Sequence, residues 1–228
     1  MKKQTNFFWP SYTDLMTSLF FIMLVLFVIT YTMQQNTVID LEKKLRVYDL
    51  VEQNLKPLKE DSALFHYELD YKRFILGFDV EFEVNKYQII KGELKNYDKT
   101  KGSIINAGEK LQNTIDNLII SRNNNSELKN VSYLLIISGS SSHLLSGQQI
   151  DDYELSYKRA YNLWYFWKIQ KGIDFESDKY QGLIDLQISG NGWGGVGRYM
   201  RDPDNNMINE TKNQRFIIQI IPKIGKVD

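Results

Sequence analysis

The sequence contains no cysteine, so the chain can form neither a disulfide nor a thiolate metal site. Net charge is also missing: 28 basic and 28 acidic residues cancel, which gives no electrostatic reason to expect nucleic-acid binding. The only histidines, His66 and His143, are isolated in the sequence, so a histidine metal site has no support. A phosphate loop, a nucleophile triad and a redox motif are absent as well. We therefore expect no enzymatic activity and no resident metal or cofactor.

One long apolar run, residues 15–33, contains no charged residue. A helix needs about 20 mostly apolar residues to cross the hydrocarbon layer of a bilayer. The run therefore predicts a transmembrane helix over residues 10–34. A signal peptide would have a shorter apolar core and a small-residue cleavage site, and the exit from Ile29 to Gln35 has no Ala-x-Ala pattern, which favours a retained anchor.

The charges that flank this run predict its orientation. Lys2 and Lys3 precede it, and the first acidic residue after it is Asp40. By the positive-inside rule, residues 1–9 are cytoplasmic and the bulk of the chain lies outside, in the periplasm of a bacterium with the helix in its inner membrane. Aromatic residues at the start of the helix predict contact with the lipid interface.

Asp14 is the informative residue of the predicted span, because it lies about one helical turn beyond Trp9. A charged group at depth costs several kcal/mol unless it faces protein or water, so such residues mark ion pathways. Thr13, Thr17 and Ser18 cluster with it and could line a polar path for protons or for sodium. The alternative is an acidic residue in the first helical turn, stabilised by the helix dipole at headgroup level.

The stretch from Phe8 to Phe27 contains the run Trp-Pro-Ser-Tyr-x-Asp-Leu-Met, followed by Phe-Phe and Leu-Val-Leu-Phe. It resembles the N-terminus of the B subunits of the Zorya anti-phage defence system, a family related to flagellar stator B subunits, ExbD and TolR. The resemblance implies that Asp14 carries protons. It also implies a homodimer inside a pentamer of a polytopic A subunit, in which the proton motive force turns one ring relative to the other. A static wall tether and a flagellar stator subunit are the alternatives.

A short stalk and linker are predicted over residues 35–60. Val38, Leu41, Leu45 and Tyr48 recur at three- and four-residue steps with charged residues between them. This pattern is compatible with a parallel two-stranded coiled coil or with an amphipathic helix packed on the domain of its own chain. Pro57 is predicted to end the helix, and residues 53–62 read as a polar hinge.

Residues 61–228 predict an α+β domain in which helices cover one face of a small mixed sheet, with a βαβαβ order and a final strand. Aromatic, β-branched or alternating segments predict strands at 74–78, 80–84, 133–137, 183–189 and 216–221. Helical periodicity predicts helices over 104–119 and 153–171, the second closed by Gly172. Residues 91–101 read as a loop.

Two segments of this domain, Leu155–Ala160 and Asn213–Ile218, resemble the Leu-Ser-x-x-Arg-Ala and Asn-x-Arg motifs of OmpA-like peptidoglycan-binding domains, over about Val80 to Pro222. The resemblance implies that Arg159 holds the carboxylate end of the stem-peptide diamino acid. The family's Gly-His-Thr-Asp motif departs here: Gly139 is kept, and Ser142 stands where the family aspartate pairs with the amine.

Asp152, beside Asp151, occupies the family asparagine position and could take over the amine contact. The candidate peptidoglycan-binding residues are therefore Gly139, Ser142, Asp151, Asp152, Leu155 and Arg159. A planar guanidinium binds a carboxylate bidentately. The alternative for Arg159 is a structural ion pair with Asp151, Asp152 or Glu154. Residues 202–206 have oxygen ligands at alternate positions but no closing glutamate, so a plain turn is favoured over calcium.

Overall fold

The computed structural model describes residues 8–143, 151–199 and 210–224, with side chains described from Tyr12 onward. The chain divides into an N-terminal unit that ends at Arg46 and a folded domain that begins at Val47. Helix α1, Phe8–Asn54, supplies the first unit and the first turns of the second.

The N-terminal part of α1 is apolar and unburied. Every large hydrophobic side chain from Tyr12 to Met33 is 42–68% exposed. Within the described residues, α1 is the one helix that is long and apolar enough to cross a membrane. This is the arrangement predicted for a single membrane span, because the apolar side chains of such a helix face lipid or partner helices.

The end of α1 packs into the domain. Val47 and Val51 are each 2% exposed, and Leu55 is buried beyond the last turn. Helix α2, Lys56–Glu60, follows at once with Pro57 in its first turn and Leu58 fully buried. The predicted polar hinge over 53–62 is therefore wrong, because apolar residues pack this segment against the core. α1 ends at Asn54, just before Pro57, as predicted, and Pro57 itself lies in the first turn of α2, where its missing N–H is not needed.

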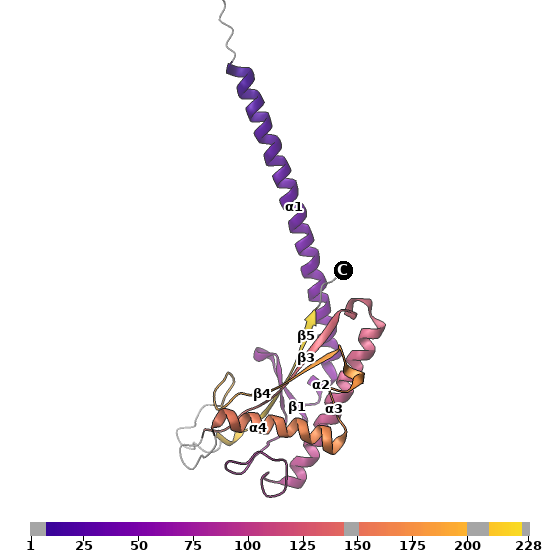
Figure 1. Ribbon diagram of the computed structural model, residues 1–228, viewed down its shortest axis with the longest axis vertical. Helices are drawn as coiled ribbons and strands as arrows, with labels where there is room; N and C mark the ends of the chain where they lie inside the picture. The colour runs from indigo at the N-terminus through magenta and orange to yellow at the C-terminus, as the bar shows by residue number, and fades with distance from the viewer. Residues whose placement is uncertain (1–7, 144–150, 200–209, 225–228) are drawn as a thin grey trace, which may run out of the picture. The chain divides into compact units, whose positions relative to one another are not determined.

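The domain is built on a five-stranded mixed sheet, which confirms the predicted α+β class. Its strands are β1 (Phe65–Glu68), β2 (Arg73–Leu76), β3 (Val131–Gly139), β4 (Ile184–Gly190) and β5 (Phe216–Ile224), in the order β1-β2-β5-β3-β4. β3 and β4 are parallel, and the other pairs are antiparallel. The last strand of the chain, β5, is the central strand of the sheet, with β2 on one side and β3 on the other, and Figure 1 shows it beside β3.

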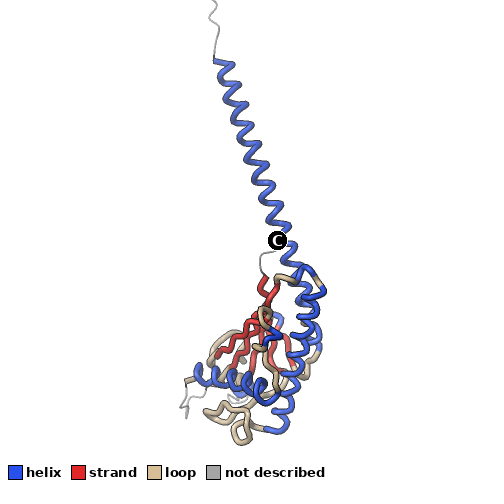
Figure 2. The backbone as a smooth tube through the Cα atoms, turned by 45° about the vertical axis from the view of Figure 1, so that its right-hand side comes forward, coloured by secondary structure: helices blue, strands red, loops and turns tan. Residues whose placement is uncertain are grey.

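Two long helices, α3 (Tyr97–Asn124) and α4 (Asp152–Tyr165), cover one face of the sheet (Figure 2). α4 continues as a π-helical turn, η3 (Phe166–Gln170), from which the buried Trp167 donates a hydrogen bond to the Ile104 carbonyl, 2.8 Å away. Three short 3-10 helices, η1 (Leu69–Tyr71), η2 (Ser126–Leu128) and η4 (Asp178–Tyr180), complete the described elements.

One predicted strand is absent from the sheet. In the segment 80–84, Val80 and Phe82 are buried as the alternation predicts, but the backbone bonds to a loop instead of a strand. The amide of Lys95 donates to the Glu81 carbonyl, and the amide of Glu83 donates to the Glu93 carbonyl, both at 2.9 Å. The strand that pairs with the outer edge of β2 is β1, which was not predicted. α3 begins at Tyr97, seven residues before the predicted start, so part of the predicted 91–101 loop is helical.

Candidate functional site

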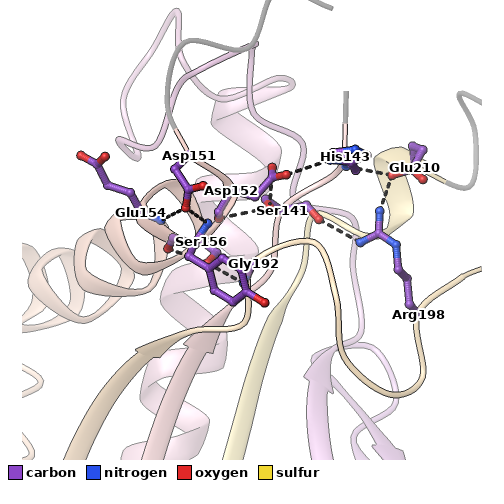
Figure 3. Close-up of polar contacts among 10 residues, drawn as sticks. Ser141, His143, Asp151, Asp152, Glu154, Ser156, Gly192, Arg198 and Glu210 are labelled. Atoms are coloured by element: carbon purple, nitrogen blue, oxygen red, sulfur yellow. Dashed lines mark hydrogen bonds and ion pairs between the residues drawn. The ribbon is translucent and has the colours of Figure 1, made fainter. Parts of the chain in front are cut away.

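Two of the candidate residues, Asp151 and Asp152, lie where the segment after β3 meets the start of α4 (Figure 3). Two glycines allow this contact. A Cβ on Gly139 would lie 2.2 Å from the Ser156 carbonyl oxygen, and a Cβ on Gly190 would lie 2.6 Å from the Tyr157 amide. Gly139 was predicted as a binding residue, and the structure gives it a packing role that brings α4 onto the sheet.

Asp151 caps α4. Its carboxylate accepts hydrogen bonds from the amides of Tyr153 at 2.8 Å and Glu154 at 3.4 Å (Figure 3). A capping side chain of this kind stabilises a helix by about 1 kcal/mol. Asp151 therefore holds the helix start that carries the next candidate, Asp152.

Asp152 is buried, 6% exposed, and organises a polar cluster. One carboxylate oxygen accepts from the Ser141 hydroxyl at 3.1 Å, and the other lies 2.9 Å from Nδ1 of His143 (Figure 3). The His143 ring stacks on Trp193 with 4.7 Å between ring centroids. Contacts from the segment after β3 thus hold a buried carboxylate at the first residue of α4.

Arg198 and Glu210 hold the segment after β3 in place. The His143 amide donates to a Glu210 carboxylate oxygen at 3.0 Å, and Arg198 donates to the Ser141 carbonyl at 3.1 Å (Figure 3). Arg198 and Glu210 also form an ion pair with each other. These contacts fix the backbone of the segment that follows β3.

Ser142 faces the closing motif instead of an open surface. Its hydroxyl accepts a hydrogen bond from the Gln214 side chain at 3.2 Å, and Gln214 accepts one from the Phe82 amide at 2.9 Å. Ser142 is 6% exposed. It therefore links the segment after β3 to the start of β5 and supplies no charge that could replace an aspartate.

Arg159 is the most unusual group in the site, because its charge is almost fully buried, with 3% of the residue exposed. Nε donates to the Lys86 carbonyl at 3.1 Å, and the guanidinium lies 4.6 Å above the centroid of the Phe82 ring. Its Nη1 is buried and has no hydrogen-bond partner among the residues that the structure describes. Burial lowers the pKa of Arg159 to about 10, an effect that the negative charge of Asp152 partly opposes.

The alternative of a structural ion pair for Arg159 finds no contact in the described ranges. Glu154 pairs with Lys158 at 2.7 Å, Asp151 caps the helix, and no acidic oxygen in those ranges lies within 4.0 Å of the Arg159 guanidinium. Leu155, the remaining candidate, is 4% exposed and packs inside the domain. The structure therefore places Arg159 and Asp152 on the same helix, both buried, and assigns Leu155 to packing.

The candidate membrane residues lie on α1. Asp14 is exposed, and Thr17 and Ser18, three and four residues later, share its face of the helix. The Thr17 hydroxyl donates to the Thr13 carbonyl at 2.8 Å, so its proton is used within the helix. Residues 202–206 lie outside the described residues, and the described residues hold no group of three or more potential metal ligands.

Sequence reasoning missed His143, Trp193, Arg198 and Glu210. His143 looked isolated because its partners, Asp152 and Trp193, come from other elements of the fold. The one local signal is that His143 directly follows the three serines that replace the family motif.

No protein-family model and no curated protein matches the chain. Among solved structures, the periplasmic domain of Helicobacter pylori MotB is 17% identical with a TM-score of 0.36, covering 71% of this chain and 88% of that one. A putative MotB-like protein from Desulfovibrio vulgaris is 14% identical, with a TM-score of 0.40 and coverages of 80% and 96%. The OmpA-like domain of FopA1 from Francisella tularensis is 22% identical, with a TM-score of 0.33 and coverages of 68% and 75%. With every identity below one quarter, a function for this chain has to be argued from its own residues.

Proposed function

We propose that this chain is a stator-type, single-pass subunit of a proton-driven motor of the Zorya defence system. In this proposal α1 crosses the inner membrane, Asp14 relays protons, and the outer domain anchors a dimer to peptidoglycan. The observation that carries the anchoring role is the buried Arg159, one nitrogen of which has no partner in the described structure, on the same helix as the buried Asp152.

An unpaired buried cation is costly, because the loss of hydration is not returned by an anion. Such a group is useful when a ligand supplies the missing anion. A carboxylate can accept two parallel hydrogen bonds from a guanidinium, and Nη1 of Arg159, which has no partner in the described structure, would be one of the two donors once a ligand reached it.

Asp152 supplies the opposite charge in the same site. It lies two turns before Arg159 on α4, and its negative charge acts on the arginine. A ligand with a carboxylate and an ammonium group a short distance apart matches this pair. The stem-peptide diamino acid of peptidoglycan carries both groups, so Asp152 takes the amine contact that Ser142 cannot make.

The membrane role rests on α1. Its apolar residues from Tyr12 to Met33 are exposed, and Asp14 is the one acidic or basic side chain in this stretch. A carboxylate in lipid surroundings is stabilised by facing protein or water. A surrounding ring of A-subunit helices would provide such a path and allow Asp14 to gain and lose a proton.

The dimer rests on the stalk pattern. Val38, Leu41, Leu45 and Tyr48 are 43–63% exposed in the single chain, whereas Val47 and Val51 pack into the domain. Exposed apolar residues at heptad spacing are typical of a helix with a partner helix. A second copy would cover this face and place the two Asp14 side chains near a common axis.

The test is Asp14→Asn, which keeps the size of the side chain and removes its ability to ionise. We expect loss of phage defence with unchanged membrane insertion and unchanged binding of the full-length protein to isolated sacculi. Asp40→Asn, on the same helix beyond the apolar run, is the matched control and should defend normally. Full defence by Asp14→Asn would rule out the relay and leave a static tether, in which Asp14 is an interfacial residue.

A flagellar stator role is separated from defence by a complementation assay. If the chain restored swimming to a stator-deficient strain and gave no protection against phage, the assignment to defence would be wrong.

A further inference from the structure

The outward face of α4 carries a row of exposed tyrosines that the proposed function does not use. They are spaced four residues apart, which places them on one side of a helix, and each is 41–59% exposed: Tyr153, Tyr157, Tyr161 and Tyr165. We refer to these four residues as the tyrosine row. The opposite side of α4, with Arg159 and Leu163, is buried against the sheet.

The rings of the row are regularly arranged. The Tyr157 and Tyr161 ring centroids are 6.3 Å apart with planes at 33°, and those of Tyr161 and Tyr165 are 6.1 Å apart with planes at 15°. Twelve residues of helix separate the first ring from the last, so the row extends for about 18 Å. Contiguous exposed apolar surface on a folded domain marks interaction or ligand-binding sites.

The row is electrically neutral. Lys158 is paired with Glu154 at 2.7 Å and lies 5.2 Å from the Tyr87 ring, while Lys168 is paired with Asp174 and Glu176, both at 3.2 Å. Anionic lipids and nucleic acids bind through unpaired basic side chains. The paired lysines therefore argue against both and favour an uncharged ligand.

The hydroxyl groups of the row are also available. Within the described ranges, none of the four phenol oxygens takes part in a hydrogen bond with another protein group. Tyrosine combines an apolar ring with a polar tip, and both can contact the same ligand. A sugar ring suits such a surface, since its C–H face packs on an aromatic ring while its hydroxyls bond to the phenol oxygens.

We infer that the tyrosine row binds the glycan strand of peptidoglycan, an inference that rests on the proposed function. The row begins at the candidate site: the Tyr153 ring lies against Gly192, whose amide donates to the Ser156 hydroxyl at 2.9 Å. A stem peptide held by Asp152 and Arg159 is attached to a glycan strand, which the row would receive. The ring spacing of about 6 Å is close to the length of one sugar unit in an extended chain.

The experiment uses the full-length protein in detergent micelles and peptide-free glycan strands, prepared from sacculi with an amidase. We expect the Tyr157→Ser/Tyr161→Ser double variant to bind these strands about tenfold more weakly than the wild type, a change of about 1.4 kcal/mol. Tyr157→Phe/Tyr161→Phe keeps the rings and should retain most of the binding. Ile120→Ser, which removes a 56% exposed apolar side chain from α3, is the control and should bind normally.

The outcomes separate this inference from the proposed function. Equal binding of glycan strands by the wild type and the serine double variant would overturn the inference. So would a wild type that binds intact sacculi but no peptide-free strands, a result that leaves the anchoring role in place. If the serine variant lost self-association in analytical ultracentrifugation while keeping glycan binding, the row would be an interface between copies. Failure of the wild type to bind sacculi at all would overturn the proposed anchoring itself.

Discussion

Replacing Arg159 by methionine should separate ligand binding from stability. Methionine is unbranched, flexible and uncharged, so it keeps an apolar side chain beside Phe82 in place of the arginine stem. The arginine is 3% exposed and has an unpartnered Nη1 within the described structure. A residue that was selected for packing would be expected to have all its polar atoms satisfied.

The expected change in stability is small because two effects oppose each other. The lowering of the Arg159 pKa to about 10 by burial corresponds to roughly 3 kcal/mol against the charged form in the folded protein. Methionine removes that cost. It also removes the hydrogen bond to the Lys86 carbonyl, worth about 1.5–3 kcal/mol, while its sulfur keeps a contact with the Phe82 ring. We expect a free energy of unfolding within about 1 kcal/mol of the wild type, hence a Tm shift of at most about 4 °C.

In contrast to stability, the affinity of Arg159→Met for peptidoglycan should fall strongly. Removing one partner of a buried, hydrogen-bonded charge pair costs about 2 kcal/mol or more, or roughly 30-fold in affinity. The assay is cosedimentation of the full-length protein with purified sacculi, measured beside thermal unfolding of the same preparation in micelles. Wild-type sedimentation by Arg159→Met would refute the role of this guanidinium in binding. A loss of several kcal/mol in stability would instead identify Arg159 as a structural residue.

Arg215→Met is the matched control, because Arg215 is a partly buried arginine whose side chain is 10% exposed and has partners. It pairs with Glu68 at 3.3 Å and donates to the Gly197 carbonyl at 2.6 Å. Burial lowers the pKa of Arg215, and the charge of Glu68 opposes this effect. Breaking such a pair lowers the free energy of unfolding by about 3 kcal/mol. This is the lower end of the usual range, because Glu68 would still form its ion pair with Arg73. We therefore expect this variant to lose stability and, where folded, to keep its binding.

Two further predictions concern the domain. Tyr133→Phe should raise the free energy of unfolding by about 1 kcal/mol, because it removes a buried hydroxyl with no partner in the described part of the chain. Burial raises the pKa of Tyr133 to about 12, so the folded state keeps a proton that the unfolded state releases above about pH 10. Stability therefore falls between about pH 10 and 12, and thermal unfolding across that range should show a smaller fall in the variant; an unchanged pH profile would contradict the assignment. Gly139→Ala should lower the free energy of unfolding by about 1–3 kcal/mol through the clash with Ser156, whereas Gly102→Ala, which meets nothing within 4 Å on α3, should raise it slightly; equal midpoints in urea for the two variants would disprove the close approach.

The agreement between sequence and structure is best where a local pattern dictates the element. The apolar run before Met33, the strand around Leu135 and the helix around Ala160 all follow from hydrophobic periodicity. The predictions of secondary structure fail where contacts between distant parts of the chain determine the structure. Val80 and Phe82 alternate like a strand, yet their segment bonds to a loop, and the strand position beside β2 goes to β1.

The sequence by itself determined that the chain has a long apolar helix with Asp14 near its start, because length and hydropathy are local properties. It also determined that Arg159 lies on a helix of an α+β domain. Only the tertiary structure decided that Arg159 is buried without a full set of partners and that His143 joins Asp152. These contacts form between elements far apart in the chain, where burial and hydrogen bonding depend on how the sheet and α4 pack, and no local pattern encodes that packing.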